Sequence, residues 1–137
     1  MLPNRQEVDA LIQELNDSQR RKTILCIDSY QGGALLGRLY GPGFREYPFD
    51  SLSQFLVVMT ALLDQDTPAS RFPDTASGIR RGNQGTFELQ IFYRRNASWQ
   101  GILLWKEQQR RQSFRSVLEL ISLLDSALEF PEELAAI

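Results

Sequence analysis

The segment Phe-Asp-Ser-Leu-Ser-Gln-Phe-Leu at residues 49–56 returns in modified form at residues 114–121 as Phe-Arg-Ser-Val-Leu-Glu-Leu-Ile. Both follow the pattern F-x-S-[LV]-x-[QE]-[FL]-[LI] at an offset of 65 residues. Upstream of them, Gly37 and Gly101 match at an offset of 64, so one connection differs by one residue. Apolar positions alone would match between any two amphipathic helices. The additional match of Phe, Ser, Gln/Glu and Gly therefore predicts an internal duplication.

Each of the two matching segments has the features of a helix start. Ser51 with Gln54, and Ser116 with Glu119, have the spacing at which a hydroxyl and a longer polar side chain cap a helix reciprocally. Apolar residues then recur with helical spacing in both halves. The sequence predicts helices over residues 51–64 and 116–129.

Strands are expected upstream of each helix. Residues 23–30 and 34–40 are rich in apolar residues on either side of Gln-Gly-Gly, and residues 86–93 alternate with period two before a return strand at 98–107. Each pair predicts an antiparallel hairpin, and each hairpin with its helix predicts a ββα repeat.

One ββα unit leaves part of its sheet uncovered, whereas two units can share one core. We therefore expect a single α+β domain over residues 1–137, in which tandem ββα repeats form a four-stranded antiparallel sheet with helices on one face. The repeats are expected at 23–64 and 86–129, with a connection at 65–85. A further N-terminal helix is expected at 4–20, because Asn4 and Glu7 form a capping signal before an apolar stripe.

The composition excludes several kinds of chemistry. The 137 residues include no His and one Cys. A chain without His has no Ser–His or Cys–His catalysis and no His-ligated metal, and one Cys forms neither an internal disulfide nor a multi-thiolate zinc site. Asp28 lies at the end of an apolar strand, where its carboxylate could be buried or could face water. We expect it to face water. We expect no enzyme, no cofactor and no metal, although catalysis by paired carboxylates stays open.

The chain has no pattern that directs it to a membrane. The first residues lack the charged and then apolar layout of a signal peptide, and the longest apolar runs are far too short to span a bilayer. The one cysteine, Cys26, lies within an apolar run, as is common in a reducing compartment. A cytoplasmic location is therefore expected, with no membrane partner and no evident small-molecule substrate.

Charge is distributed unevenly along the chain. The formal net charge of −2 is made up of −3 over residues 1–79, +6 over 80–115 and −5 over 116–137. Aromatic residues alternate with the bases of the second hairpin, and arginine forks with aromatic faces suit contact with acidic groups, phosphates and bases. The expected partner-binding residues are Arg94, Arg95, Trp99, Lys106, Arg110, Arg111 and Arg115.

Three interpretations of this basic hairpin stay open. Its arginines can pair internally with the acidic residues of 116–129, or they can bind a protein partner with an acidic surface, which includes a second copy of the chain. Alternatively, they can bind nucleic acid or a nucleoprotein, as a regulator or as a mobile-element inhibitor of a host nuclease. The isoelectric point near 5.2 argues against a dedicated nucleic-acid binder. The sequence therefore favours a non-enzymatic protein-binding module.

The second half also resembles a known pattern. The chain contains N-x-S-W-Q-G at residues 96–101, F-R-S-x-L-E-L at 114–120 and L-L-D-S-A-L at 123–128. This combination resembles small uncharacterised proteins of gut Firmicutes (clostridia), over residues 86–128 and more loosely over the first half. The resemblance implies a bacterial origin and carries no activity.

Overall fold

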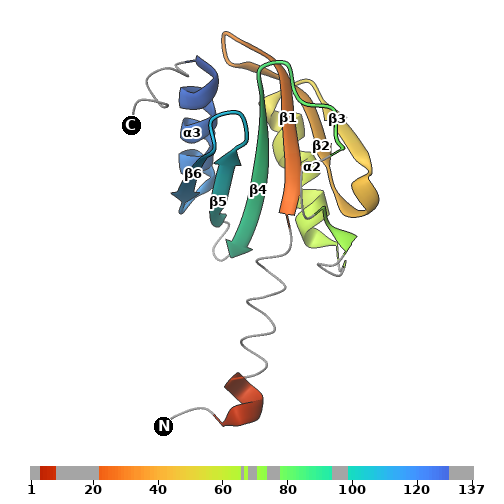
Figure 1. The fold of residues 1–137 in the computed structure, drawn as a ribbon, viewed down its shortest axis with the longest axis vertical. Helices are drawn as coiled ribbons and strands as arrows, with labels where there is room; N and C mark the ends of the chain where they lie inside the picture. The colour runs from red at the N-terminus through yellow and green to blue at the C-terminus, as the bar shows by residue number, and fades with distance from the viewer. Residues whose placement is uncertain are drawn as a thin grey trace.

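A computed structural model of the chain describes residues 4–8, 22–65, 67, 71–73, 78–93 and 99–129. Six antiparallel strands form one sheet in the order β3-β2-β1-β4-β5-β6, and two helices lie on one of its faces (Figure 1). The elements are β1 (Lys22–Gln31), β2 (Ala34–Tyr40), the short 3-10 helix η1 (Pro42–Phe44), β3 (Glu46–Phe49), α2 (Leu52–Asp64), β4 (Gly85–Tyr93), β5 (Gln100–Trp105), β6 (Arg110–Phe114) and α3 (Val117–Glu129).

The α+β class is confirmed, but the expectation of four strands was wrong. Each half has three strands before its helix, so the units are βββα, and the additional strands β3 and β6 form the two edges of the sheet. β3 contains Pro48, and β6 begins with the polar run Arg-Arg-Gln-Ser. Short edge strands often carry proline and charge, which discourage pairing with other chains. Because of these residues, neither segment has the apolar alternation by which a strand is predicted from sequence.

The register of the sheet follows the sequence repeat. In the first half, Gly37 of β2 lies opposite Phe49 of β3, and in the second half Gly101 of β5 lies opposite Phe114 of β6. Both phenylalanines are buried in the core. The offsets of 64 and 65 residues found in the sequence are thus also those of the paired positions.

The strand pairs β1–β2 and β4–β5 have an irregularity at matching positions, 64 residues apart. The register between β1 and β2 shifts between Ile27 and Ser29, and that between β4 and β5 shifts between Ile91 and Tyr93. A bulge bends its strand and increases the local twist. The two halves of the sheet therefore change direction at matching points.

Both long helices begin at the predicted caps. In α2, the Ser51 hydroxyl oxygen accepts the N–H of Gln54 at 3.1 Å. In α3, the Ser116 hydroxyl oxygen accepts the N–H of Glu119 at 3.1 Å, and the Glu119 carboxylate accepts the N–H of Arg115 at 2.7 Å. These bonds satisfy amide groups that would otherwise lack a partner in the first turn.

The helices close one core over the sheet. Their buried side chains recur with helical spacing and pack against alternate residues of the central strands. The fully buried members of this core include Phe55, Met59, Phe87, Leu25, Leu39, Leu89 and Leu120. Both halves contribute, so one core spans the pair.

The N-terminal segment is described only at its start. Residues 5–8 are helical, and the Asn4 side chain accepts the N–H of Glu7 at 2.8 Å, as the capping signal predicts. The rest of the helix expected at 4–20 lies outside the described residues. Within the described part of the chain, no helix has the length and apolar character needed to cross a membrane.

The matched glycines provide a test of the shared register. A Cβ atom at Gly37 would overlap the backbone carbonyl of Cys26, and one at Gly101 would overlap that of Gln90. Alanine normally stabilises a strand relative to glycine, but here we expect Gly37→Ala and Gly101→Ala each to lower the free energy of unfolding, by about 1–3 kcal/mol. Urea denaturation measures the loss, and an alanine variant as stable as the wild type would contradict the assignment.

Candidate functional site

The β5–β6 hairpin is held to the sheet through its turn. Gln109 has the left-handed φ of 49°, and its side-chain amide donates to the Lys106 carbonyl at 2.8 Å. The N–H of Lys106 donates to the carbonyl of Thr86 in β4 at 2.9 Å, and the Glu107 carboxylate accepts the N–H of Thr86 at 2.7 Å. These bonds fix where β6 begins, and with it the positions of the arginines on that strand.

Two of the expected partner-binding residues make contacts within the fold. Trp99 is only 6% exposed and belongs to the hydrophobic core, so its aromatic face is not available to a partner. The Lys106 ammonium lies 3.3 Å from the carboxylate of Glu88, within the protein. Arg94 and Arg95 lie outside the described residues, and their role stays a prediction.

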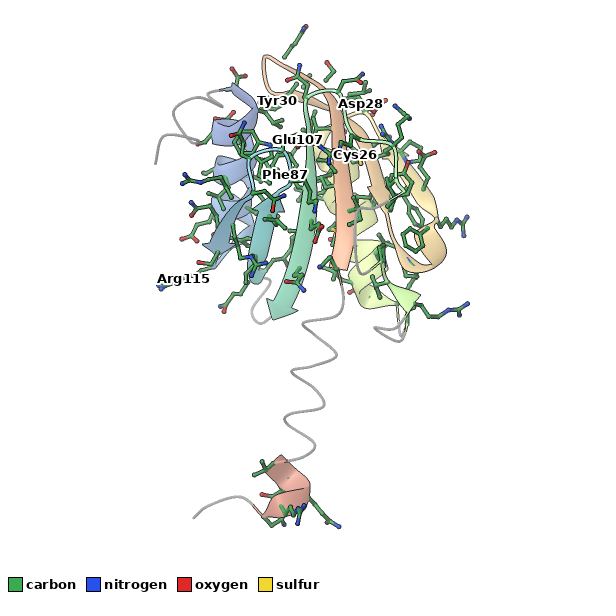
Figure 2. All side chains as sticks on the ribbon, viewed as in Figure 1. Cys26, Asp28, Tyr30, Phe87, Glu107 and Arg115 are labelled. Atoms are coloured by element: carbon green, nitrogen blue, oxygen red, sulfur yellow. The ribbon has the colours of Figure 1, made fainter. Side chains whose placement is uncertain are left out.

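Two of the other expected residues, Arg110 and Arg111, lie on the edge strand β6, and Arg115 follows it directly. Arg110 lies opposite Trp105, whose side chain is in the core, and Arg111 lies opposite Leu104 on the neighbouring register position. Because side chains alternate along a strand, Arg110 belongs to the helix-covered face and Arg111 to the other face. Arg111 and Arg115 are exposed, and Arg115 points away from the molecule in Figure 2. We call Arg110, Arg111 and Arg115 the β6 arginines.

Two charged clusters on the uncovered face were not anticipated from the sequence. The first surrounds Glu88, which is 6% exposed. Its carboxylate lies 3.0 Å from the Lys22 ammonium and 3.3 Å from that of Lys106. Burial raises the pKa of Glu88, but the two lysines more than offset this, so its pKa lies below the ordinary value of 4.5.

The second cluster surrounds Arg38, whose side chain is 4% exposed. The guanidinium is paired with the carboxylate of Asp28, donates to the Tyr40 hydroxyl at 3.0 Å and lies 3.4 Å from the carboxylate of Glu46. The guanidinium also donates to the carbonyl of Arg80 at 2.6 Å. A buried guanidinium needs such a shell of acceptors.

Asp28 is therefore paired, although exposure to water was the expectation. Burial raises the pKa of Asp28, but the hydrogen bonds from Arg38 and from the N–H of Asn83 more than offset this effect. The pKa of Asp28 therefore lies below its ordinary value. The available signal was Arg38 itself, a charge in the interior of the apolar strand ALLGRLY. A sequence shows that such a charge needs a partner without showing which residue supplies it.

The Arg38 cluster also fastens the last part of the connection, residues 78–84, across the uncovered face. The N–H of Asn83 donates to Asp28 at 3.2 Å, and the N–H of Gln84 donates to the Ile27 carbonyl at 2.8 Å. Gly82 sits so close to the backbone of Ile27 that a Cβ atom would overlap it. In Figure 1 this segment crosses in front of β1.

Cys26 lies beneath that segment, beside Asp28 in Figure 2. It is fully buried, and its thiol donates to the Arg80 carbonyl at 3.5 Å. Burial raises the pKa of the thiol above its ordinary value, which disfavours the reactive thiolate. The surroundings of Cys26 are thus those of a structural side chain. Across the described ranges, no group of three or more Cys, Asp or Glu residues is placed to hold a metal ion.

A further contact joins the two halves on the helix side. The Tyr30 hydroxyl donates to the Asp125 carboxylate at 2.5 Å, which raises the pKa of Tyr30 to about 12. A mostly apolar pocket of about 260 Å³ adjoins it, with Leu35, Leu52 and Leu124 among its lining residues. This contact ties the first hairpin to α3.

A second depression runs between β6 and α3. It is an open groove of about 410 Å³, and Arg115 lies next to it, because its N–H donates to the lining residue Glu119. Small polar side chains predominate along it, and the lining residues are Ser113, Glu119, Ser122, Leu123 and Ser126. The groove and the β6 arginines together form the candidate site.

Comparison with known protein families, with curated proteins and with solved structures found no match. The resemblance of the second half to small Firmicutes proteins therefore stays a prediction.

The Arg38 cluster predicts a large stability effect from one carboxylate. We expect Asp28→Ala to lower the free energy of unfolding by about 3 kcal/mol, because it removes the main partner of a buried guanidinium. Glu46→Ala is the matched control, since Glu46 is 51% exposed and contacts the same guanidinium, and it should cost below about 1 kcal/mol. Equal losses in urea denaturation would show that Asp28 is not the main partner.

The lowered pKa of Glu88 predicts acid sensitivity. As pH falls below 4.5, the unfolded chain binds a proton at Glu88 before the folded chain does, so the stability that this carboxylate contributes is lost as pH falls through its folded pKa. Glu88→Gln should be less stable than the wild type at neutral pH and should lose less stability on acidification. Urea denaturation at a series of pH values tests this, with Glu129→Gln on the exposed side of α3 as control; an unchanged acid dependence in Glu88→Gln would refute it.

Proposed function

We propose that the chain is a non-enzymatic protein-binding module that recognises an acidic protein partner through the β6 arginines. The carrying observation is that Arg110 and Arg111 lie on the edge strand β6, with Arg115 directly after it, and that an open groove lies between this strand and α3. Lys106 is not part of this surface, because its ammonium pairs with Glu88. Arg94 and Arg95 are proposed to belong to the same interface. A cytoplasmic setting, which the buried Cys26 favours, is part of the proposal.

A protein partner is favoured over nucleic acid by the arrangement of the hairpin. Arg110 and Arg111 belong to opposite faces of β6, so they do not form one plane along which a phosphate backbone would run. Trp99 and Trp105 are buried, so neither offers its ring for stacking on a base. Carboxylates of an extended or folded protein can approach the edge from both faces.

Charge reversal at the β6 arginines tests this proposal. The probe is a fluorescein-labelled short peptide of alternating glutamate and valine, and its affinity is measured by anisotropy at low and at high salt. We expect Arg111→Glu/Arg115→Glu to weaken binding by about tenfold or more at low salt and salt to weaken the wild type, because opposite charges attract across the interface and ions screen them.

The matched control is Arg5→Glu/Arg71→Glu, which changes the net charge equally at exposed positions outside the hairpin. This control should bind the peptide as the wild type does. Equal losses in the two double variants would mean that only overall charge matters, and the proposal would fail. Tighter binding of a short DNA duplex than of the peptide, lost in the first variant alone, would favour the nucleic-acid alternative.

A further inference from the structure

The two edges of the sheet differ at one pair of matching positions. An edge strand has unpaired N–H and C=O groups that can accept another strand. In β3, Pro48 lies opposite Arg38, and the corresponding residue of β6 is Ser113, which lies opposite Ile102. Proline has no N–H to offer. The β3 edge is therefore protected at this position, whereas the β6 edge keeps its donor.

The hydrogen bonds of the hairpin show which groups of β6 point outward. The N–H of Lys106 points to β4, where it donates to Thr86. Directions alternate along a strand, so the residue before it, Trp105, points to β6 and forms a hydrogen-bonded pair with Arg110. Two positions on, the N–H and C=O groups of Gln112 also point inward, and those of Arg111 and Ser113 point away from the sheet.

The groove lies where an additional strand would run. Ser113 lines it from the edge of the sheet, and Ser122, Leu123 and Ser126 line it from α3 together with Glu119, whose carboxylate accepts a hydrogen bond from the N–H of Arg115. An extended chain in this position pairs with β6 through its backbone and packs alternate side chains against the helix. Small serine side chains on the helix leave room for it. Recognition by strand addition beside a helix is a recurring way of binding peptides.

We propose that an extended acidic segment of a protein partner adds to β6 as a seventh antiparallel or parallel strand. This inference rests on the proposed function, because it assigns a binding mode to the same surface. Carboxylates of the segment lie across from Arg111 on the uncovered face. Small apolar residues alternate with them and face Leu123 and the serines of α3.

Charge selects this occupant over a second copy of the chain. β6 carries Arg110 and Arg111 and no acidic residue. Pairing of β6 with its own copy would place four guanidinium groups in one two-stranded ladder, and like charges across a ladder are destabilising. An acidic segment instead places carboxylates beside Arg111, the exposed arginine of the strand. Self-association through β6 is therefore an outcome of the test and not the proposal.

The decisive variant is Ser113→Pro, which removes the outward N–H and gives β6 the residue that β3 already has. The matched control, Ser113→Ala, removes the hydroxyl and keeps the N–H. With the glutamate–valine peptide we expect Ser113→Pro to weaken binding by about tenfold and Ser113→Ala to leave it nearly unchanged, because only the former removes a backbone hydrogen bond and obstructs its neighbour. Equal affinities of the two variants would overturn the inference.

A second measurement, on the wild type, tests strand addition even if the proline variant fails to fold. On saturation with the peptide, hydrogen exchange at the Arg111 and Ser113 amides should slow, while the amide of Gln112, already paired with β5, should change less. Binding that depends on the β6 arginines but leaves both outward amides unprotected would overturn strand addition and leave the proposed function standing. Binding that depends on neither would overturn both. A protein that light scattering shows to be a dimer, with these amides protected before peptide is added, would assign the edge to a second copy and overturn the acidic segment.

Discussion

The pairing of β1 with β4 is the constraint on which the rest of the structure depends. It joins two βββα halves into one sheet, with Leu25 opposite Phe87 and Thr23 opposite Leu89 at the seam. These residues are buried to 1% exposure or less. Without this pairing, each half would have a further open edge and a core only one helix wide. With it, both helices lie on one face, and the two edges that remain are β3 and β6.

The seam also explains why charges are buried on the face that the helices leave uncovered. Glu88 lies opposite Ile24 at the seam, and Arg38 lies one strand away, opposite Cys26. Each charge has opposite charges around it, since removal from water is costly for an unpaired ion. Lys106 is thereby bound within the protein. The proposed partner surface therefore does not include Lys106 and is assigned to the β6 arginines.

The two halves are alike in register, bulges and caps, and the proposed function depends on where they differ. A duplicated unit produces two edges of equal kind, yet Pro48 closes one and Ser113 leaves the other open. The charges show the same asymmetry at one position, because β3 holds Glu46 where β6 holds Arg111. The surface that we propose for an acidic segment thus arises from differences between the halves of a repeat that otherwise builds the core.

The sequence by itself determined the repeat, the two helices with their serine caps and the four inner strands, because these depend on local periodicity and on hydrogen bonds between residues three or four apart. It did not reveal β3 and β6, since short polar edge strands have no apolar alternation and are defined only by the neighbour with which they pair. The sequence identified the basic residues but not which of them are buried, paired or exposed. Whether Trp99 joins the core, Lys106 pairs with Glu88 or Arg111 faces outward is decided by strand register, which brings together residues far apart in the chain. Only the tertiary structure therefore showed that Lys106 pairs with Glu88, whereas Arg111 lies exposed on the edge strand.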